Sequence, residues 1–317
     1  MRLGSMGKRR IRLLKEMYPE FQIYGIGRSE DKRATVKKEY GVDSFSNLGE
    51  INISIDCAFV STSPLSHAEL ISECLKRGWN VFTELNLVHD RYDENIQLAR
   101  SAGLTLFLSS TFLYREEIRY IRSKINPHQK WNYIYHIGQY LPDWHPWESY
   151  KDFFIGDQRT NGCREIMAIE LPWLTETFGN VCDVNVISDK MTGLDIDYKD
   201  NYMIQLQHDN GNKGTLIVDV VSPCAVRKLE AYSEGHYITW SGTPDSLAEF
   251  DSASGRLTSV LMHEKTEHQD GYSAMVVENA YKNEIREFFD VVRGKKEAIY
   301  DFEKDLLVLN LIDRIGA

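Results

Sequence analysis

The segment 164–170 places charged side chains beside apolar ones in a helical pattern. Arg164 and Glu165 adjoin the apolar Ile166, and Glu170 follows. A carboxylate buried among apolar groups has a raised pKa and can exchange a proton near neutral pH. An arginine can clamp a substrate carboxylate or phosphate through two hydrogen bonds. Glu165, oriented by Arg164, and Glu170 are therefore our candidate catalytic residues.

These charges also have structural interpretations. Arg164 and Glu165 can form a structural ion pair, because structural pairs and active sites both perturb charges. Glu170 lies five residues after Glu165, so the two carboxylates do not share a helix face. An isolated helical carboxylate is also commonly a solvated charge.

A short glycine loop at the start of the chain is suited to binding phosphate. It precedes a helical pattern over residues 8–17 and consists of Gly4, Ser5, Met6 and Gly7. The two glycines fit a dinucleotide fingerprint whose first glycine position is Arg2, and short glycine loops also occur as ordinary turns. In that fingerprint the loop backbone approaches a pyrophosphate at the helix N-terminus. We predict that this loop binds a dinucleotide.

About twenty residues further on, a predicted strand over 22–26 is followed by Gly27, Arg28 and Ser29. Dinucleotide-binding folds read the adenosine ribose here: an acid bonds the 2′-hydroxyl of NAD, and an arginine accommodates the 2′-phosphate of NADP. We predict NADP as the preferred cofactor, with NAD as the alternative. Arg28 as a simple exposed charge is the competing interpretation.

Two segments carry a family resemblance. Residues 58–67 read Ala-Phe-Val-Ser-Thr-Ser-Pro-Leu-Ser-His, and residues 78–84 read Gly-Trp-Asn-Val-Phe-Thr-Glu. Together they resemble the Gfo/Idh/MocA oxidoreductases, relatives of glucose-fructose oxidoreductase and inositol dehydrogenase, in which TPxxxH is followed by GKHVxxEKP. Tyr281, Glu284 and Phe288 are similar to that family's Y…E…F helix. The resemblance extends over nearly the whole chain.

The resemblance implies an NAD(P)-binding Rossmann domain over 1–118 and a substrate-binding and oligomerisation α/β domain over 119–317. It implies hydride transfer to or from a hydroxyl or carbonyl carbon of a sugar, cyclitol or sugar nucleotide. It also implies a homodimer or homotetramer formed through the C-terminal sheet. The cofactor residues that it adds are Ser61, Thr62, Ser63, Pro64, His67 and Glu84.

The chain departs from the family at the catalytic motifs. Leu85 and Asn86 replace the lysine and proline of EKP, and Ile169 and Pro172 replace the histidine and aspartate of HxxD. Leucine and isoleucine can neither donate nor accept a proton. Either the chemistry has moved to the 164–170 segment, or the protein is an NAD-dependent glycosidase of the same fold or a non-catalytic regulator that binds a dinucleotide and a ligand.

An aromatic stretch over 138–147 resembles a YLPDWxP stretch of polysaccharide-associated members. Trp144 or Trp147 can stack on a sugar face, with core packing as the alternative. His145 can act as an acid or base, with a surface-loop histidine as the alternative. Tyr114 follows a predicted strand at its carboxyl end, where open α/β sheets bind ligands. Tyr114, Trp144 and His145 are our candidate substrate residues.

The elements that position these residues fall into two patterns. Strands alternate with helices up to residue 118, which predicts a parallel sheet; the strands are 22–26, 57–61, 80–84 and 104–109, and the helices 30–40, 66–77 and 90–102. Strands follow one another after residue 120, which predicts an antiparallel meander; they are 131–141, 202–208, 215–221, 228–233, 236–241 and 257–262. One helix near 164–178 interrupts the meander and two close the chain. The predicted class is α/β, a doubly wound Rossmann domain followed by an α/β domain with an open, mainly antiparallel sheet.

Composition limits the classes of binding partner and the cellular compartment that we expect for this protein. The 317 residues carry 37 basic and 47 acidic side chains, a net charge of −10, which disfavours nucleic-acid binding. We find no apolar run long enough to span a membrane, and no metal-ligand spacing. Five cysteines without a CxxC pair predict reduced thiols and a cytoplasmic protein. We expect a small, sugar-like substrate as the partner.

We expect the chain to lack residues at both of its ends. A strand should precede Gly4 in a sheet of this kind, so we expect the first strand to be missing. Residues 313–317 stop inside a helical pattern. A chain without the first strand should bind its cofactor weakly.

Overall fold

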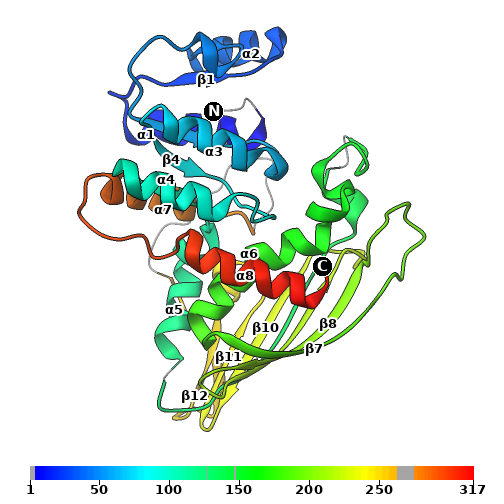
Figure 1. Ribbon diagram of the computed structural model, residues 1–317. Helices are drawn as coiled ribbons and strands as arrows, with labels where there is room; N and C mark the ends of the chain where they lie inside the picture. The colour runs from blue at the N-terminus through cyan, green and yellow to red at the C-terminus, as the bar shows by residue number, and fades with distance from the viewer. Residues whose placement is uncertain (1–3, 126, 146–147, 263–274) are drawn as a thin grey trace. The chain divides into compact units, whose positions relative to one another are not determined.

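The computed structural model describes residues 4–125, 127–145, 148–262 and 275–317. The chain forms two compact units (Figure 1). Unit 1 comprises Met1–Ser109 and Lys282–Glu303, and unit 2 comprises Ser110–Tyr281 and Lys304–Ala317. The sequence pattern placed one boundary at residue 118. The structure instead joins residues 110–118 to unit 2 and returns 282–303 to unit 1.

Unit 1 alternates short strands with helices, as predicted. Its elements are α1 (Ser5–Met17), β1 (Tyr24–Ile26), α2 (Glu30–Tyr40), β2 (Asp43–Phe45), β3 (Cys57–Val60), α3 (His67–Lys76), β4 (Asn80–Thr83), α4 (Tyr92–Ala102), β5 (Leu106–Leu108) and most of α7 (Glu278–Val292). All strand pairs are parallel, in one sheet β1-β2 and another β3-β4-β5. The first strand expected before Gly4 lies outside the described residues.

Aromatic rings explain why a helix distant in sequence belongs to unit 1. Phe59, Phe82 and Phe107 stack across β3, β4 and β5, with centroids 4.7 and 5.3 Å apart. Phe288 of α7 packs edge-on against all three rings, at 5.3 to 5.6 Å. Such pairs add about 0.5–1.5 kcal/mol beyond the area that they bury. The apolar face of α7 therefore completes the core over this sheet.

Unit 2 is built on an eight-stranded sheet with the order β13-β12-β11-β10-β6-β9-β8-β7. Its elements are α5 (Glu116–Lys124), β6 (Asn132–Gly138), α6 (Gly162–Phe178), β7 (Val181–Asp189), β8 (Asn201–His208), β9 (Lys213–Asp219), β10 (Val226–Ser233), β11 (His236–Trp240), β12 (Ala248–Asp251), β13 (Arg256–Ser259) and most of α8 (Phe302–Ile315). Neighbouring strands are antiparallel except β6 and β9, which pair in parallel. The predicted mixed α/β class with a mainly antiparallel second sheet is confirmed.

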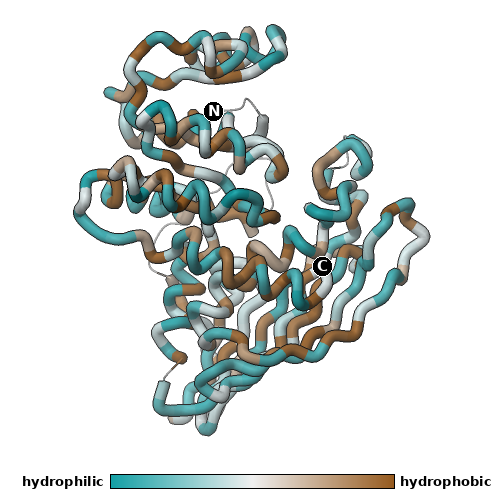
Figure 2. Tube along the Cα trace, in the orientation of Figure 1, coloured by the Kyte–Doolittle hydropathy of each residue, from teal (hydrophilic) through white to brown (hydrophobic). Residues whose placement is uncertain are grey.

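The two faces of this sheet differ. α6 packs against β8 and β9, with α8 beside it on the same side (Figure 1). Along β8 the side chains of Tyr202, Ile204 and Leu206 are buried, whereas Met203 between them is exposed. Figure 2 shows bands of hydrophobic and hydrophilic residues along these strands. The alternation is that of a sheet with one covered and one open face.

In the described part of the chain, no helix has the length and apolar character required to cross a membrane.

Candidate functional site

The N-terminus of α1 is the first component of the predicted cofactor site. Gly4 is the N-cap residue in an extended conformation, and no side chain of the described residues caps the helix. A β-carbon at Gly4 would meet no atom within 4 Å. The first amides of a helix lack acceptors within it, so this end offers donors to an anion. Ser5, Met6 and Gly7 form the first turn of α1, whereas the sequence pattern placed them in a loop before a helix that begins at residue 8.

The turn after β1 is the second component. The hydroxyl of Ser29 accepts a hydrogen bond from the amide of Lys32 and so caps α2. Arg33 donates from Nη1 to the carbonyls of Gly27 and Arg28, at 2.6 and 3.1 Å. The side chain of Arg28 is exposed. Arg28 is therefore available to an external phosphate, while the Ser29 hydroxyl already serves the helix.

The loop after β3 is the third component. The Ser66 hydroxyl donates to Thr62 Oγ1 at 2.7 Å and also lies 2.8 Å from the Ser63 carbonyl, which closes a tight turn. Ser61 and Pro64 are buried, whereas Thr62 and Ser63 are half-buried. Of these four predicted cofactor residues, Thr62 and Ser63 have the accessible side chains.

Glu84 lies at the carboxyl end of β4 in a buried ionic cluster. Arg10 Nε and Nη2 donate to its two oxygens at 2.7 and 2.9 Å. Arg10 Nη2 also donates to Glu284 Oε2 at 2.7 Å, and Ser109 Oγ donates to Glu284 Oε1 at 3.0 Å. Burial raises the pKa of Glu284, and the nearby Arg10 opposes this rise. Glu84 is thus a carboxylate held in place by a bidentate ion pair.

Sequence reasoning missed Arg10 as a member of this cluster. The basic residues of α1 suggest a solvated face, but the Arg10 side chain is fully buried and lies 4.5 Å over the Phe82 ring. Glu284, with which it pairs, is 274 residues away. The one available signal was the resemblance that singled out Glu84 and Glu284 separately.

His67 does not occupy an accessible position. Its side chain is 2% exposed, and its ring nitrogens face Asn86 Oδ1 at 2.6 Å and the Thr62 carbonyl at 3.0 Å. Burial lowers the pKa of His67. We expected His67 to bind the cofactor. In the structure it instead contacts the backbone of the Thr62 turn, because it opens α3 directly beneath that turn.

On α6, the structure assigns separate partners to the predicted catalytic residues. Arg164 Nη1 donates to Asp313 Oδ1 of α8 at 2.7 Å. The guanidinium thus ties α6 to α8, a role different from the orienting of Glu165 that we expected.

Glu165 is the chemically distinctive residue of α6. Its Oε2 atom is buried and accepts no hydrogen bond from the described residues. Burial raises the pKa of Glu165 from 4.5 to about 7. Ile169 lies one helical turn further on and is half-buried like Glu165, so the two side chains share a helix face. Glu165 therefore presents a titratable group on the same helix face as Ile169.

Glu170 is fully buried, and both of its carboxylate oxygens accept hydrogen bonds. Its Oε1 accepts from Arg227 Nε and Nη2 at 3.1 and 2.6 Å. Its Oε2 accepts from Tyr135 OH and Trp173 Nε1, both at 2.7 Å. Burial also raises the pKa of Tyr135, with Glu170 adding to the rise. We considered a catalytic carboxylate or a solvated charge for Glu170, and the geometry instead makes it the centre of a buried network.

The substrate-side aromatics differ in accessibility. Trp144 is half-buried and donates from Nε1 to the Gln139 carbonyl at 3.0 Å. His145 Nδ1 lies 2.7 Å from Glu148 Oε1, and its ring centroid is 4.3 Å from that of Phe153. Trp147 lies outside the described residues. Trp144 therefore keeps an exposed portion that a sugar ring can contact.

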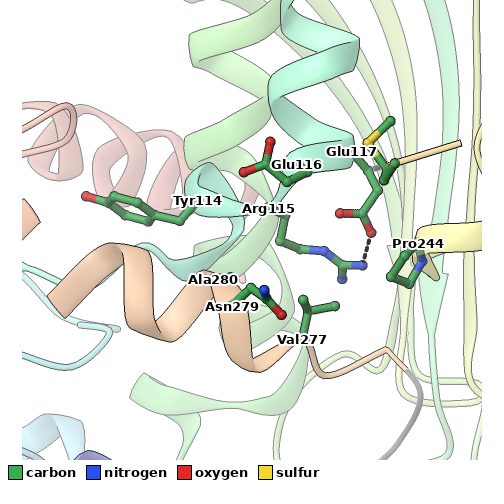
Figure 3. A pocket seen from close by; sticks show the side chains of 9 residues that line it. Tyr114, Arg115, Glu116, Glu117, Pro244, Val277, Asn279 and Ala280 are labelled. Atoms are coloured by element: carbon green, nitrogen blue, oxygen red, sulfur yellow. Dashed lines mark hydrogen bonds and ion pairs between the residues drawn. The ribbon is translucent and has the colours of Figure 1, made fainter. Parts of the chain in front are cut away.

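Tyr114 is turned inward and is only 2% exposed. In Figure 3 its ring points away from the guanidinium of Arg115, which pairs with Glu117. The cavity beside them has a volume of about 20 Å³, enough for one water molecule. Tyr114 thus offers a sugar no surface here, because the short helix that carries it packs its ring into the core.

Two apolar side chains occupy the positions at which we expected the family's catalytic lysine and histidine. Leu85 is half-buried directly after Glu84, and Ile169 is half-buried on α6. Among the residues with defined structure, no group of three or more His, Cys, Asp or Glu side chains can hold a metal ion.

The N-terminal part of the chain matches a known family. Residues 3–110 match the profile of GFO_IDH_MocA, described as an oxidoreductase family with an NAD-binding Rossmann fold. No curated protein matches the chain in sequence at a significant level.

Solved structures resemble the chain over nearly its full length. Levoglucosan dehydrogenase in complex with NADH has a TM-score of 0.80 at 13% identity, covering 99% of this chain and 94% of that one. The WlbA dehydrogenase from Bordetella pertussis, solved with NADH and UDP-GlcNAcA, has a TM-score of 0.77 at 14% identity, covering 100% and 95%. Biliverdin reductase from Synechocystis sp. PCC 6803, solved with biliverdin and NADP+, has a TM-score of 0.74 at 16% identity, covering 99% and 96%. These similarities establish the fold.

Proposed function

Because residues 3–110 belong to the Gfo/Idh/MocA oxidoreductases, whose Rossmann fold binds NAD, we propose that this protein is an NAD(P)-dependent dehydrogenase or reductase. We propose a hydroxyl or carbonyl carbon of a sugar, cyclitol or sugar nucleotide as the site of reaction. Levoglucosan dehydrogenase and the WlbA dehydrogenase share the fold and support this substrate class. The observation that carries the proposal is Glu165, a carboxylate with an unpaired buried oxygen and a pKa near 7.

The chain's residues fit a dinucleotide. The uncapped amides of α1 at Gly4–Gly7 would hold the pyrophosphate, and Thr62 and Ser63 would contact the nicotinamide half. The exposed guanidinium of Arg28 would pair with a 2′-phosphate, so NADP is the form that we propose as preferred. The bound nicotinamide supplies or accepts a hydride.

Glu165 accepts or donates the proton that is transferred together with the hydride. When a hydroxyl group is oxidised, its oxygen loses a proton as its carbon loses a hydride, and Glu165 Oε2 accepts that proton. In the reductive direction the protonated Glu165 donates it. A pKa near 7 leaves both forms populated at neutral pH, which suits either direction. Arg164 and Glu170 act on the position of α6, through Asp313 and Arg227 respectively.

The substrate side is supported by Trp144. Its partly exposed indole can stack on a sugar face, while its Nε1 bond to Gln139 fixes the ring. His145 follows Trp144 in the sequence, and its Nδ1 lies 2.7 Å from Glu148 Oε1.

The open face of the large sheet is our proposed surface for a homodimer or homotetramer. Its exposed apolar side chains include Ile187, Met203, Ile134 and Tyr232, at 70, 47, 44 and 39% exposure. Ile187 and Met203 are direct cross-strand partners. Apolar groups gathered on one face of a sheet indicate a surface that another chain covers.

The test is turnover of NADPH or NADH with sugars, cyclitols and sugar nucleotides, comparing the native protein with Glu165→Gln. General acid–base catalysis contributes about 100-fold or more, so kcat should fall by at least that factor. Glu176→Gln, on the same helix, is the control and should retain kcat. An unchanged kcat in Glu165→Gln would exclude this residue as the proton carrier.

Two other outcomes would replace the proposal. Glycoside cleavage without net change in NADH would identify a glycosidase of the same fold. Calorimetric binding of a dinucleotide without any turnover would identify a non-catalytic binding protein, which the inert Leu85 and Ile169 favour.

A further inference from the structure

A continuous chain of buried polar groups leads to the predicted cofactor loop of unit 1. The Asn86 amide lies between the Tyr92 hydroxyl, at 2.7 Å from Nδ2, and His67 Nδ1, at 2.6 Å from Oδ1. His67 Nε2 then lies 3.0 Å from the carbonyl of Thr62. His67, Asn86 and Tyr92 are at most 4% exposed, so water cannot replace these bonds.

The positions of the protons in this series of hydrogen bonds follow from which atoms can donate and which can only accept. In the arrangement above, the nearest partners of both ring nitrogens of His67 are carbonyl-type oxygens, which only accept hydrogen bonds. Nδ1 also lies 3.4 Å from Thr83 Oγ1, a more distant hydroxyl that can donate or accept. That arrangement provides an acceptor for each of the two N–H groups of the doubly protonated ring. Burial disfavours the charged ring and lowers the pKa of His67, although the charge of Glu84 acts in the opposite direction.

A rotation of the Asn86 amide by 180° fits the neutral ring equally well. Nδ2 then donates to His67 Nδ1, and Oδ1 accepts from the Tyr92 hydroxyl, which can be either donor or acceptor. In both arrangements His67 Nε2 donates to the Thr62 carbonyl. The primary amide is both donor and acceptor, so it can match either form of the histidine. The proline of the family motif at this position has no such group.

We propose that Asn86 is a positioning residue that keeps His67 bonded to the Thr62 carbonyl in both protonation states of the ring. It thereby fixes the turn at Thr62 and Ser63. The inference rests on the proposed function in one respect, namely that this turn contacts NAD(P)H.

The experiment compares Asn86→Ala, Asn86→Asp and the control Asn95→Ala. Asn95 is as deeply buried as Asn86, and its Nδ2 donates to the carbonyl of Ala68 in α3 at 3.0 Å. It does not belong to the series of hydrogen bonds that leads to Thr62. Histidine side-chain ¹⁵N NMR, with the His67 signals assigned from His67→Gln, reports the tautomer and titration. NADPH dissociation constants are measured on the same samples.

We expect Asn86→Ala to shift the His67 ring signals and the Thr62 amide signal and to weaken NADPH binding about tenfold, with a raised KM and an unchanged kcat. Aspartate only accepts, so Asn86→Asp should hold His67 doubly protonated to higher pH and retain NADPH affinity within about twofold. Asn95→Ala should leave the His67 signals and the affinity unchanged.

Unchanged His67 signals in Asn86→Ala, or an equal loss of affinity in Asn95→Ala, would overturn the assignment. If the native protein binds neither NADPH nor NADH, the proposed function fails. The His67 and Thr62 resonances would then still decide whether Asn86 orders this turn.

Discussion

Glu165→Gln should stabilise the protein at alkaline pH. A carboxyl whose pKa rises from 4.5 unfolded to about 7 folded is neutral in both states at low pH and carries no penalty there. Between pH 4.5 and 7 the unfolded state releases this proton while the folded state retains it, so stability falls across this window and the loss is complete above pH 7. The full pKa difference corresponds to about 3 kcal/mol. Because part of the side chain is exposed, we expect Glu165→Gln to gain about 2 kcal/mol at pH 8.5 and little at pH 5.

Urea unfolding followed by circular dichroism at the two pH values measures this difference. Glu176→Gln is the matched control on α6, because Glu176 pairs with Arg122 and Lys304 at 3.1 and 2.7 Å. Its removal should cost up to about 1 kcal/mol at pH 8.5, the opposite sign. A gain in Glu165→Gln that is equal at both pH values, or absent at pH 8.5, would show that the carboxyl is not held in a desolvated site.

Three further outcomes are expected. Glu170→Gln should lower the free energy of unfolding by about 3 kcal/mol or more, measured in urea, because the charge of Arg227 stays buried without its partner; a loss below 1 kcal/mol would contradict this. Ile187→Glu combined with Met203→Glu should reduce the molar mass in light scattering to that of a monomer, and an unchanged assembly would exclude this face. Arg28→Gln should weaken NADPH binding about tenfold and leave NADH unaffected in calorimetry, and parallel losses would argue against a 2′-phosphate contact.

Local pattern was sufficient for most elements of the fold. Apolar periodicity located α3, α6 and six strands of the large sheet to within a few residues, but it missed β7 and β12. It did not reveal that α7 belongs to the core of unit 1, because the contacts of Phe288 with Phe59, Phe82 and Phe107 link segments about 180 to 230 residues apart. It also predicted a simple meander, whereas the parallel pairing of β6 and β9 depends on α6, β7 and β8 intervening between them.

At the candidate site, the sequence indicated backbone turns more readily than the partners of side chains. The Gly4 loop and the Thr62 turn follow from backbone requirements that a short motif records. The partners of Arg10 and Glu170 were not predictable, because the spacing of residues within one segment carries no information about ion pairs with distant segments. The basic residues of α1 and the lone carboxylate of α6 both suggested solvated groups, whereas Arg10 and Glu170 proved to be buried and paired.

The buried carboxylates differ in how their desolvation is offset. Glu170 receives four hydrogen bonds, and Glu84 and Glu284 share the guanidinium of Arg10. Such pairing offsets part of the desolvation cost of a buried charge. Glu165 has no donor at Oε2 among the described residues, and its penalty is not compensated. A well-packed apolar residue would be more stable there, as Ile169 is one turn later. An uncompensated desolvation cost is common at functional sites, and it is therefore the observation on which our proposal of Glu165 as the proton carrier rests.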